Sequence, residues 1–236
     1  MLYIVDIETG RLLRKLDTGV GAAQDPLGRS RPNGLATPAV VDINGDAQVD
    51  YVFAGDLRGN LWKFDIRDAN SGNWKIAYDT EGVPQPLFTA RDPENDALAQ
   101  PITSRPEIIR GPRGVGMMVL FGTGKYLETT DTAIDADAPE IQSYYGLFDL
   151  NTGGDDDPIE DAGELVQQTI TSETSVTLDG KTVDLRITSQ QALGNHRGWY
   201  LNLRSPSGYD GERVVSNAVV RAGRVIFTTL IPESDP

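Results

Sequence analysis

The sequence contains no cysteine and only one histidine, His196. Without cysteine there can be no disulfide, no thiolate zinc site and no cysteine nucleophile. The single histidine lies in the turn-like segment LGNHRGW, so we expect it to cap a loop or face solvent. Chemistry that needs thiolates or paired imidazoles is therefore excluded.

Basic residues are also scarce. The chain has 21 Lys and Arg against 35 Asp and Glu, for a net charge of −14. Such a field repels DNA, RNA and anionic membranes, so we expect no nucleic-acid partner. No run of about 18 apolar residues is present, so no membrane span is predicted. The start, MLYIVD, lacks a signal-peptide pattern and reads as strand, so we expect a piece of a longer protein.

Long helical periodicity is missing too, and helical turns are expected only near Asp161 to Gln168. Short apolar runs alternate instead with turn residues along the whole chain. Such runs are typical of hairpins and short strands. They are LYIVDIETGRLLRKL, DYVFAGDLRGNLWKFDI, GMMVLFGTGKYLE (turning at Gly122–Gly124), GWYLNL and NAVVRAGRVIFTTLIP.

A weak internal repeat connects these runs. TPAVVD leads to YVFAGD and GNLWKFDI, SRPEII leads to MVLFGT and YYGLFDL, and SNAVV leads to RVIFTTLI. Each copy predicts an inner, a second and a third strand, with polar insertions at 70–100 and 129–143 expected to be surface loops. The repeat predicts an all-β fold: a modified β-propeller, present as a partial ring, with 1–236 as one propeller-like domain. A β-sandwich is the alternative.

The segment DINGDAQVD, between two of the predicted strands, carries oxygen side chains at alternate positions. Asp42, Asn44 and Asp46 occupy positions one, three and five of a loop, and Asp50 occupies position nine. The carbonyl of Gln48 falls at position seven, where calcium loops use the backbone. Calcium takes six to eight such oxygens, so the loop predicts a calcium site.

The match to a helix-loop-helix calcium site is incomplete. Phe53 replaces the usual glutamate at position twelve, and Ala47 replaces glycine at position six, so the turn is expected to bend differently. A solvated turn rich in Asp and Asn is the alternative. Asp135, Asp137 and Glu140 are a weaker candidate cation site. The FGTGK segment lacks the spacing of a phosphate-binding loop, so we expect a strand turn there.

These residues resemble a known family. VVDINGDAQVDYVFAGDLRGNLWKFDI, VLFGTGKYLE and GWYLNL … GERVVSNAVVRAGRVIFTTLIP are similar to the C-terminal domain of the PilY/PilC proteins, type IV pilus tip adhesin and biogenesis factors of Gram-negative bacteria. The resemblance implies a quinoprotein-like propeller with one calcium ion, held by Asp42, Asn44, Asp46, Asp50 and the Gln48 carbonyl. It also implies that calcium occupancy regulates pilus extension and retraction.

The same resemblance implies export to the outer membrane, cell surface or pilus tip, with pilus components such as minor pilins as partners. The adhesive N-terminal part of such proteins is not in this chain, so host-surface binding is not carried over. We expect no enzyme activity. The alternatives are a quinoprotein-like dehydrogenase, which would typically need a cysteine pair, and a generic extracellular binding module with structural calcium.

Overall fold

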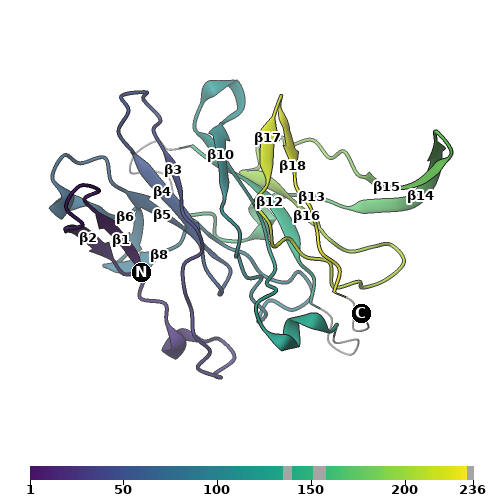
Figure 1. The fold of residues 1–236 in the computed structure, drawn as a ribbon, viewed down its shortest axis with the longest axis horizontal. Coiled ribbons are helices and arrows are strands. Elements are labelled where there is room, and N and C mark those ends of the chain that lie inside the picture. The colour runs from purple at the N-terminus through teal and green to yellow at the C-terminus, as the bar shows by residue number, and fades with distance from the viewer. Residues whose placement is uncertain (135–139, 151–157, 233–236) are drawn as a thin grey trace.

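The computed structural model describes residues 1–134, 140–150 and 158–232, and short strands dominate them (Figure 1). The first large sheet has the order β3-β4-β5-β6, and a fifth strand, β9, pairs with β5. Their bounds are β3 Ala39–Val41, β4 Tyr51–Gly55, β5 Asn60–Asp65, β6 Lys75–Ile76 and β9 Phe88–Thr89. We call this sheet blade 1.

The second large sheet, blade 2, has the order β10-β11-β12-β16-β13, in which only β13 and β16 run parallel. Its strands are β10 Glu107–Arg110, β11 Met117–Gly122, β12 Ser143–Asp149, β16 Gly198–Asn202 and β13 Val166–Gln168. The insertion between β13 and β16 forms a long hairpin, β14 Ile170–Leu178 and β15 Lys181–Thr188, which projects from the blade (Figure 1).

Three smaller hairpins complete the described chain. They are β1 Leu2–Val5 with β2 Leu12–Leu16, β7 Tyr78–Thr80 with β8 Val83–Gln85, and β17 Val219–Arg221 with β18 Arg224–Ile226. The β1–β2 hairpin flanks blade 1 and the β17–β18 hairpin flanks blade 2 (Figure 1). The strands β3, β10 and β17 start consecutive repeats, as the internal repeat predicts, and β10 contacts both of the others.

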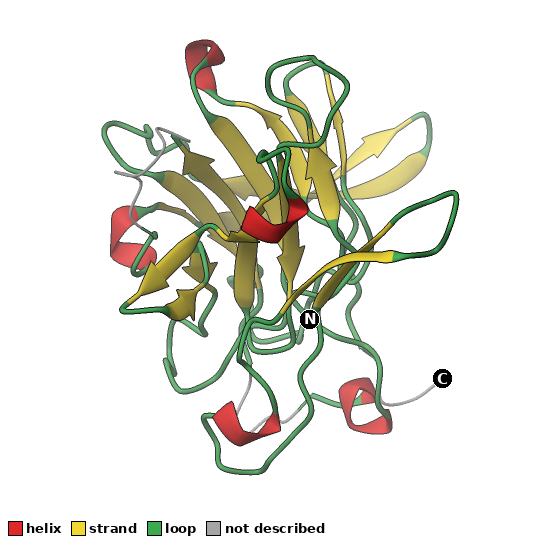
Figure 2. Ribbon diagram, turned by 90° about the vertical axis from the view of Figure 1, so that its left-hand side faces the viewer, coloured by secondary structure: helices red, strands yellow, loops and turns green. Residues whose placement is uncertain are grey.

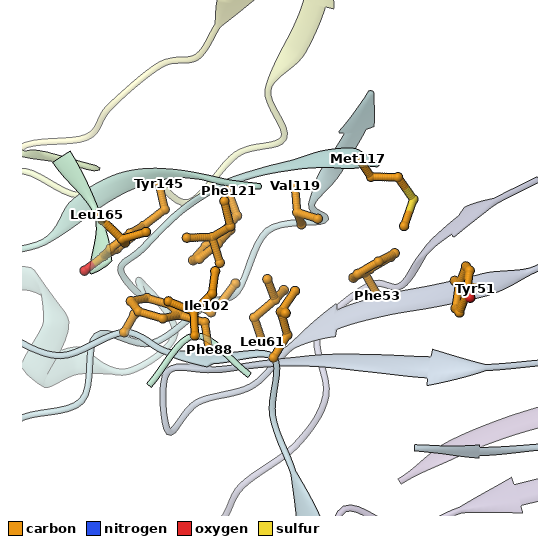
Figure 3. Packing of buried hydrophobic residues seen from close by; sticks show 14 residues of the cluster. Tyr51, Phe53, Leu61, Phe88, Ile102, Met117, Val119, Phe121, Tyr145 and Leu165 are labelled. Atoms are coloured by element: carbon orange, nitrogen blue, oxygen red, sulfur yellow. The ribbon is translucent and has the colours of Figure 1, made fainter. Parts of the chain in front are cut away.

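Both faces of blade 1 are buried, which separates this fold from a sandwich. Tyr51 and Phe53 of β4 pack toward blade 2, whereas Val52 and Ala54 pack toward the N-terminal hairpin. Figure 3 shows the first of these interfaces, with Phe53 and Leu61 facing Val119 and Phe121. Each sheet of a β-sandwich buries only one of its faces. A sheet that is buried on both faces between neighbouring sheets, as here, is the arrangement of a propeller blade. No closed ring forms among the described residues, and the fold is a partial β-propeller.

Equivalent glycines end the second strand of each blade. A Cβ on Gly55 would lie 2.2 Å from Cγ2 of Ile102, and a Cβ on Gly122 would lie 2.3 Å from Cβ of Val214. The amides of Ile102 and Val214 donate to the carbonyls of Asp56 and Thr123, one residue after each glycine. Each glycine therefore makes room for the segment that leads toward the next repeat.

The insertion at 70–100 corrects one expectation, because it is not simply a surface loop. It supplies β6 and β9 to blade 1, and Leu87 and Phe88 are buried in the core between the blades. The amide of Leu87 donates to the Leu61 carbonyl over 2.8 Å. Strand pairing along β5 draws this polar-looking segment into the core, which local composition did not indicate.

One local prediction was wrong, and another was confirmed only in part. No hairpin turns at Gly122–Gly124: β11 pairs with the distant β12, and the amides of Thr123 and Gly124 donate to the carbonyls of Ser143 and Pro101. The helical turns expected at 161–168 are confined to the 3-10 turn Ala162–Glu164. Parallel pairing with β16 makes Val166–Gln168 a strand instead.

The helical content of the described residues consists of 3-10 turns set in the loops, coloured red in Figure 2. They are Ala22–Gln24, Ser71–Asn73, Pro112–Gly114, Thr129–Thr132 and Ala162–Glu164. Within the part of the chain that the structure describes, no helix is long and apolar enough to cross a membrane.

Candidate metal centre

The predicted calcium loop, residues 42–50, joins β3 to β4 at the edge of blade 1 (Figure 1). The two strands pair antiparallel, with Val41 opposite Tyr51. The loop therefore leaves the sheet at Val41 and re-enters it at the paired residue Tyr51. All of its oxygen-bearing side chains lie in the short connection between these two residues.

The carboxylate of Asp42 organises the first half of the loop. Its Oδ1 accepts a hydrogen bond from the Gly45 amide at 2.7 Å, and its Oδ2 accepts one from the Ala47 amide at 2.8 Å. The Gly45 amide is the main cause that holds the pKa of Asp42 below its usual value. Asp42 is therefore ionised at neutral pH, as a calcium ligand must be.

The next two side chains repeat this pattern at shorter range. Asn44 Oδ1 accepts from the Asp46 amide, and Asp46 Oδ1 accepts from the Gln48 amide, both at 2.8 Å. Such bonds to an amide two residues ahead are the turns that Asp and Asn favour. They hold the loop compact while every one of these oxygens keeps a further lone pair.

Asp50 closes the neck of the loop. It is only 6% exposed, and its Oδ2 accepts a hydrogen bond from the Ile43 amide at 2.8 Å. Its own amide donates to the carbonyl of Val41, also at 2.8 Å. The ninth position thus connects both ends of the loop to the sheet.

Two residues in the loop have left-handed backbone conformations. Gly45 has φ +81°, and Ala47 has φ +67°. Ala47 therefore adopts the conformation that glycine favours at position six, although its Cβ makes this costly. The loop makes the same turn with alanine at position six. Alanine in place of glycine therefore adds backbone strain to the loop and leaves its path largely unchanged.

The donor set fits calcium, but it is not a preassembled cage. Among the residues that the structure describes, no three acidic or histidine side chains converge closely enough to hold a metal ion. The carboxylates face the loop's own amides instead. Carboxylate, amide and carbonyl oxygens are nevertheless the ligands that calcium takes, in flexible geometry. Calcium binding at these residues stays a prediction.

Comparison with known proteins places the chain in a family. Residues 1–181 match the family described as the PilY1 beta-propeller domain. The chain belongs to the PilY1 β-propeller family. It is 33% identical over 266 residues to the type IV pilus biogenesis factor PilY1 of Pseudomonas aeruginosa strain PAO1, covering 100% of this chain and 21% of the relative. It is 35% identical over 241 residues to a PilY1 homolog of Xylella fastidiosa, covering 98% and 15%.

A solved structure agrees with this assignment. The crystal structure of the Pseudomonas aeruginosa PilY1 C-terminal domain superposes with a TM-score of 0.82 at 30% identity, covering 98% of this chain and 49% of that one. The PilY1 resemblance and the propeller fold predicted from the sequence are thus confirmed. The chain spans about a fifth or less of the curated relatives described above.

The other segments singled out in the sequence have different outcomes in this PilY1-family chain. The weaker cation site falls mainly on residues 135–139, outside the described residues, and Glu140 alone is described there. Lys125 of the FGTGK segment pairs with Asp131, which leaves it engaged within the protein. His196 is exposed, and its Nδ1 lies 3.1 Å from the Leu193 carbonyl, as expected for a loop-capping residue.

Sequence reasoning missed the role of Asp56, which follows β4. Asp56 is 1% exposed, and its carboxylate accepts hydrogen bonds from Asn33 Nδ2, Trp62 Nε1 and the Arg58 amide, among others. The segment AGDLRGN carried the signal, since an aspartate that opens a turn, here three residues before Gly59, is a typical turn organiser. Asp56 anchors the β4–β5 turn and the preceding loop and lies outside the calcium loop.

Proposed function

We propose that this chain is a calcium-binding, non-enzymatic domain of a type IV pilus biogenesis protein. The observation that carries the proposal is the loop 42–50 in a chain of the PilY1 family: three carboxylates and one amide within nine residues, with the neck closed by Asp50. Asp42, Asn44, Asp46 and Asp50 would supply side-chain oxygens, and Gln48 its carbonyl. Calcium would supply charge neutralisation and a cross-link between β3 and β4.

Calcium occupancy would regulate the domain by ordering the loop and its surroundings. Binding would draw the carboxylates together around the cation, which offsets their mutual repulsion, so the calcium-bound loop would be the better ordered form. No helix flanks the loop to be reoriented on binding, so a large opening motion is not expected. We propose that occupancy biases the pilus between extension and retraction, through minor pilins bound at the cell surface or pilus tip after export.

Calcium titration by calorimetry, with thermal melts in calcium and in chelator, tests the binding step. We expect one site and a melting temperature that rises with calcium, because a ligand that binds only the folded state stabilises it. The double variant Asp42→Ala/Asp46→Ala should lose high-affinity binding and stay folded. Asp6→Ala/Asp68→Ala is the matched control, since these aspartates also accept backbone hydrogen bonds in exposed turns. Parental affinity in the loop variant would show that the loop is not the site.

The same two variants in the full-length protein test the pilus role. Cells with the loop variant should show an altered balance of extension and retraction, and cells with the control variant should not. Pull-down of minor pilins separates a pilus role from a generic extracellular module with structural calcium. A quinone absorption spectrum in the purified protein would favour the dehydrogenase alternative instead.

A further inference from the structure

A cavity of about 300 Å³ lies beside the candidate calcium loop, between β3 of blade 1 and β10 of blade 2. It opens at the end of the core between the two blades where Met117 lies (Figure 3). Ligand sites in proteins run from about 300 to 1,000 Å³, so this cavity has room for roughly one large residue. The residues used below, all in its lining, are Val41, Asp42, Ile43, Ile108, Arg110 and Met117.

Apolar side chains from both blades form about half of the cavity wall, and among the described lining residues Arg110 is the cationic one. Val41, Ile43 and Ile108 are half-buried and pack against the core between the blades. Arg110 ends β10 and shares a sheet face with Ile108, because alternate residues of a strand point the same way. Its partner across the strand pair is Met117, another wall residue. Arg110 thus extends the face that blade 2 turns toward the calcium loop.

In the part of the chain that the structure describes, Arg110 is exposed and forms no ion pair, whereas nearby Arg105 pairs with Glu107 over 2.7 Å. A guanidinium beside an apolar pocket matches a carboxylate attached to an apolar group. This match is notable in a chain of net charge −14, which repels anions elsewhere.

We propose that this cavity binds the C-terminal residue of a partner polypeptide, with an apolar side chain in the pocket and the α-carboxylate on Arg110. A C-terminal residue carries an apolar side chain and a carboxylate within one residue, and the cavity volume allows one residue. An internal apolar residue followed by an acidic residue would need more room. Asp42 belongs both to the cavity and to the calcium loop, so its charge opposes the incoming carboxylate. Bound calcium cancels two of the loop's three carboxylate charges, so binding is stronger with calcium.

The calcium dependence rests on the function proposed above, whereas recognition of the carboxylate by Arg110 does not. The probe is N-acetyl-L-phenylalanine, compared with its uncharged amide, by calorimetry or ligand-observed NMR in calcium and in chelator. We expect the acid to bind at least about tenfold more tightly than the amide, since only the acid forms a charge-assisted hydrogen bond with Arg110. Calcium should raise the affinity for the acid about three- to tenfold.

Arg110→Gln should remove the preference for the acid and leave amide binding unchanged. Arg221→Gln is the matched control, because Arg221 is exposed and ends β17 as Arg110 ends β10. Equal binding of acid and amide, or no binding of either, overturns the proposal. If calcium binds but does not change affinity for the acid, the calcium dependence is wrong. If calcium itself does not bind, the proposed function fails, and the comparison of acid and amide in chelator still decides the pocket.

Discussion

At the scale of single residues, the candidate calcium loop, residues 42–50, combines favourable and unfavourable backbone geometry. Asp42 accepts two amide hydrogen bonds and Asp50 closes the neck, and both support the turn. Ala47 opposes it, since a left-handed alanine costs of the order of 1–2 kcal/mol. The strain lies at the position where the calcium-loop pattern has glycine, so it can be relieved by one substitution.

Replacing Ala47 with glycine is expected to stabilise the folded protein. Relief of the left-handed strain exceeds the extra unfolded-chain entropy of glycine by about 0.5–1 kcal/mol, which raises the melting temperature by about 1–4 °C. Differential scanning calorimetry in chelator measures this change in melting temperature. Ala97→Gly is the control: Ala97 is exposed in a turn without a left-handed conformation, so glycine there should lower stability slightly. A lower melting temperature for Ala47→Gly would contradict the strain argument.

At the scale of elements, each of the two blades is a unit of strands whose second member ends in a glycine. That glycine lets the segment heading for the next repeat cross at van der Waals distance, over Gly55 in blade 1 and over Gly122 in blade 2. The repeat seen in the sequence therefore has a packing cause. Insertions such as 70–100 and the β14–β15 hairpin vary between the repeats, but these crossings do not.

Gly122→Ala should destabilise the protein by about 1–3 kcal/mol, because the added methyl group overlaps Val214 in a well-packed core. Urea unfolding measures the effect. Gly34→Ala is the control, since a Cβ added there would meet no atom within 4 Å and its φ is not positive. Combining Gly122→Ala with Val214→Ala should cost at least about 1 kcal/mol less than the sum of the single changes. Additive costs would show that Val214 is not the obstacle.

At the scale of the whole molecule, a buried ion pair joins the two blades. Lys63 Nζ of β5 lies 2.8 Å from Asp149 Oδ2 of β12, with side chains 4% and 0% exposed. The same ammonium lies 4.5 Å from the ring centroid of Tyr51, the residue that follows the calcium loop. The pair thus connects the root of the loop to the neighbouring blade.

Lys63→Met should cost about 3–5 kcal/mol of unfolding free energy, because it removes this cation from a buried carboxylate. Lys63→Met/Asp149→Leu should recover most of the loss, since both charges are then gone. Arg105→Met breaks the exposed pair with Glu107 and should cost at most about 1 kcal/mol. Equal losses for the buried and exposed pairs in urea titrations would refute an inter-blade role.

Acid should unfold the protein chiefly below about pH 4. The Arg31 side chain, through its hydrogen bonds to Asp25, holds the pKa of that carboxyl well below its usual range. For Asp131, burial raises the pKa, but hydrogen bonds from Lys125 and two amides outweigh it and lower the pKa. A carboxyl group whose pKa is lower in the folded than in the unfolded state stabilises the folded protein fully when the pH is above its unfolded-state pKa. This stabilisation is lost as the pH falls through its folded-state pKa.

Urea midpoints measured at about pH 7 down to about pH 3 test this expectation. They should be nearly constant down to about pH 5 and then fall. Arg31→Met removes the side chain whose hydrogen bonds lower the pKa of Asp25. The variant should therefore be less stable than the parent at neutral pH and differ least from it at the lowest pH. A midpoint that stays constant over the whole range in both proteins would exclude the linkage.

The sequence by itself determined the strand units, their repeat and the oxygen spacing of the candidate calcium loop, and it favoured a propeller over a sandwich. These features depend on neighbours along the chain: alternation, turn residues and the positions of Asp42 to Asp50. Only the tertiary structure decided the partners of β11, the burial of Leu87 and Phe88, and the cavity between β3 and β10. Those features depend on segments brought together across long sequence separations, where burial and strand pairing override local composition.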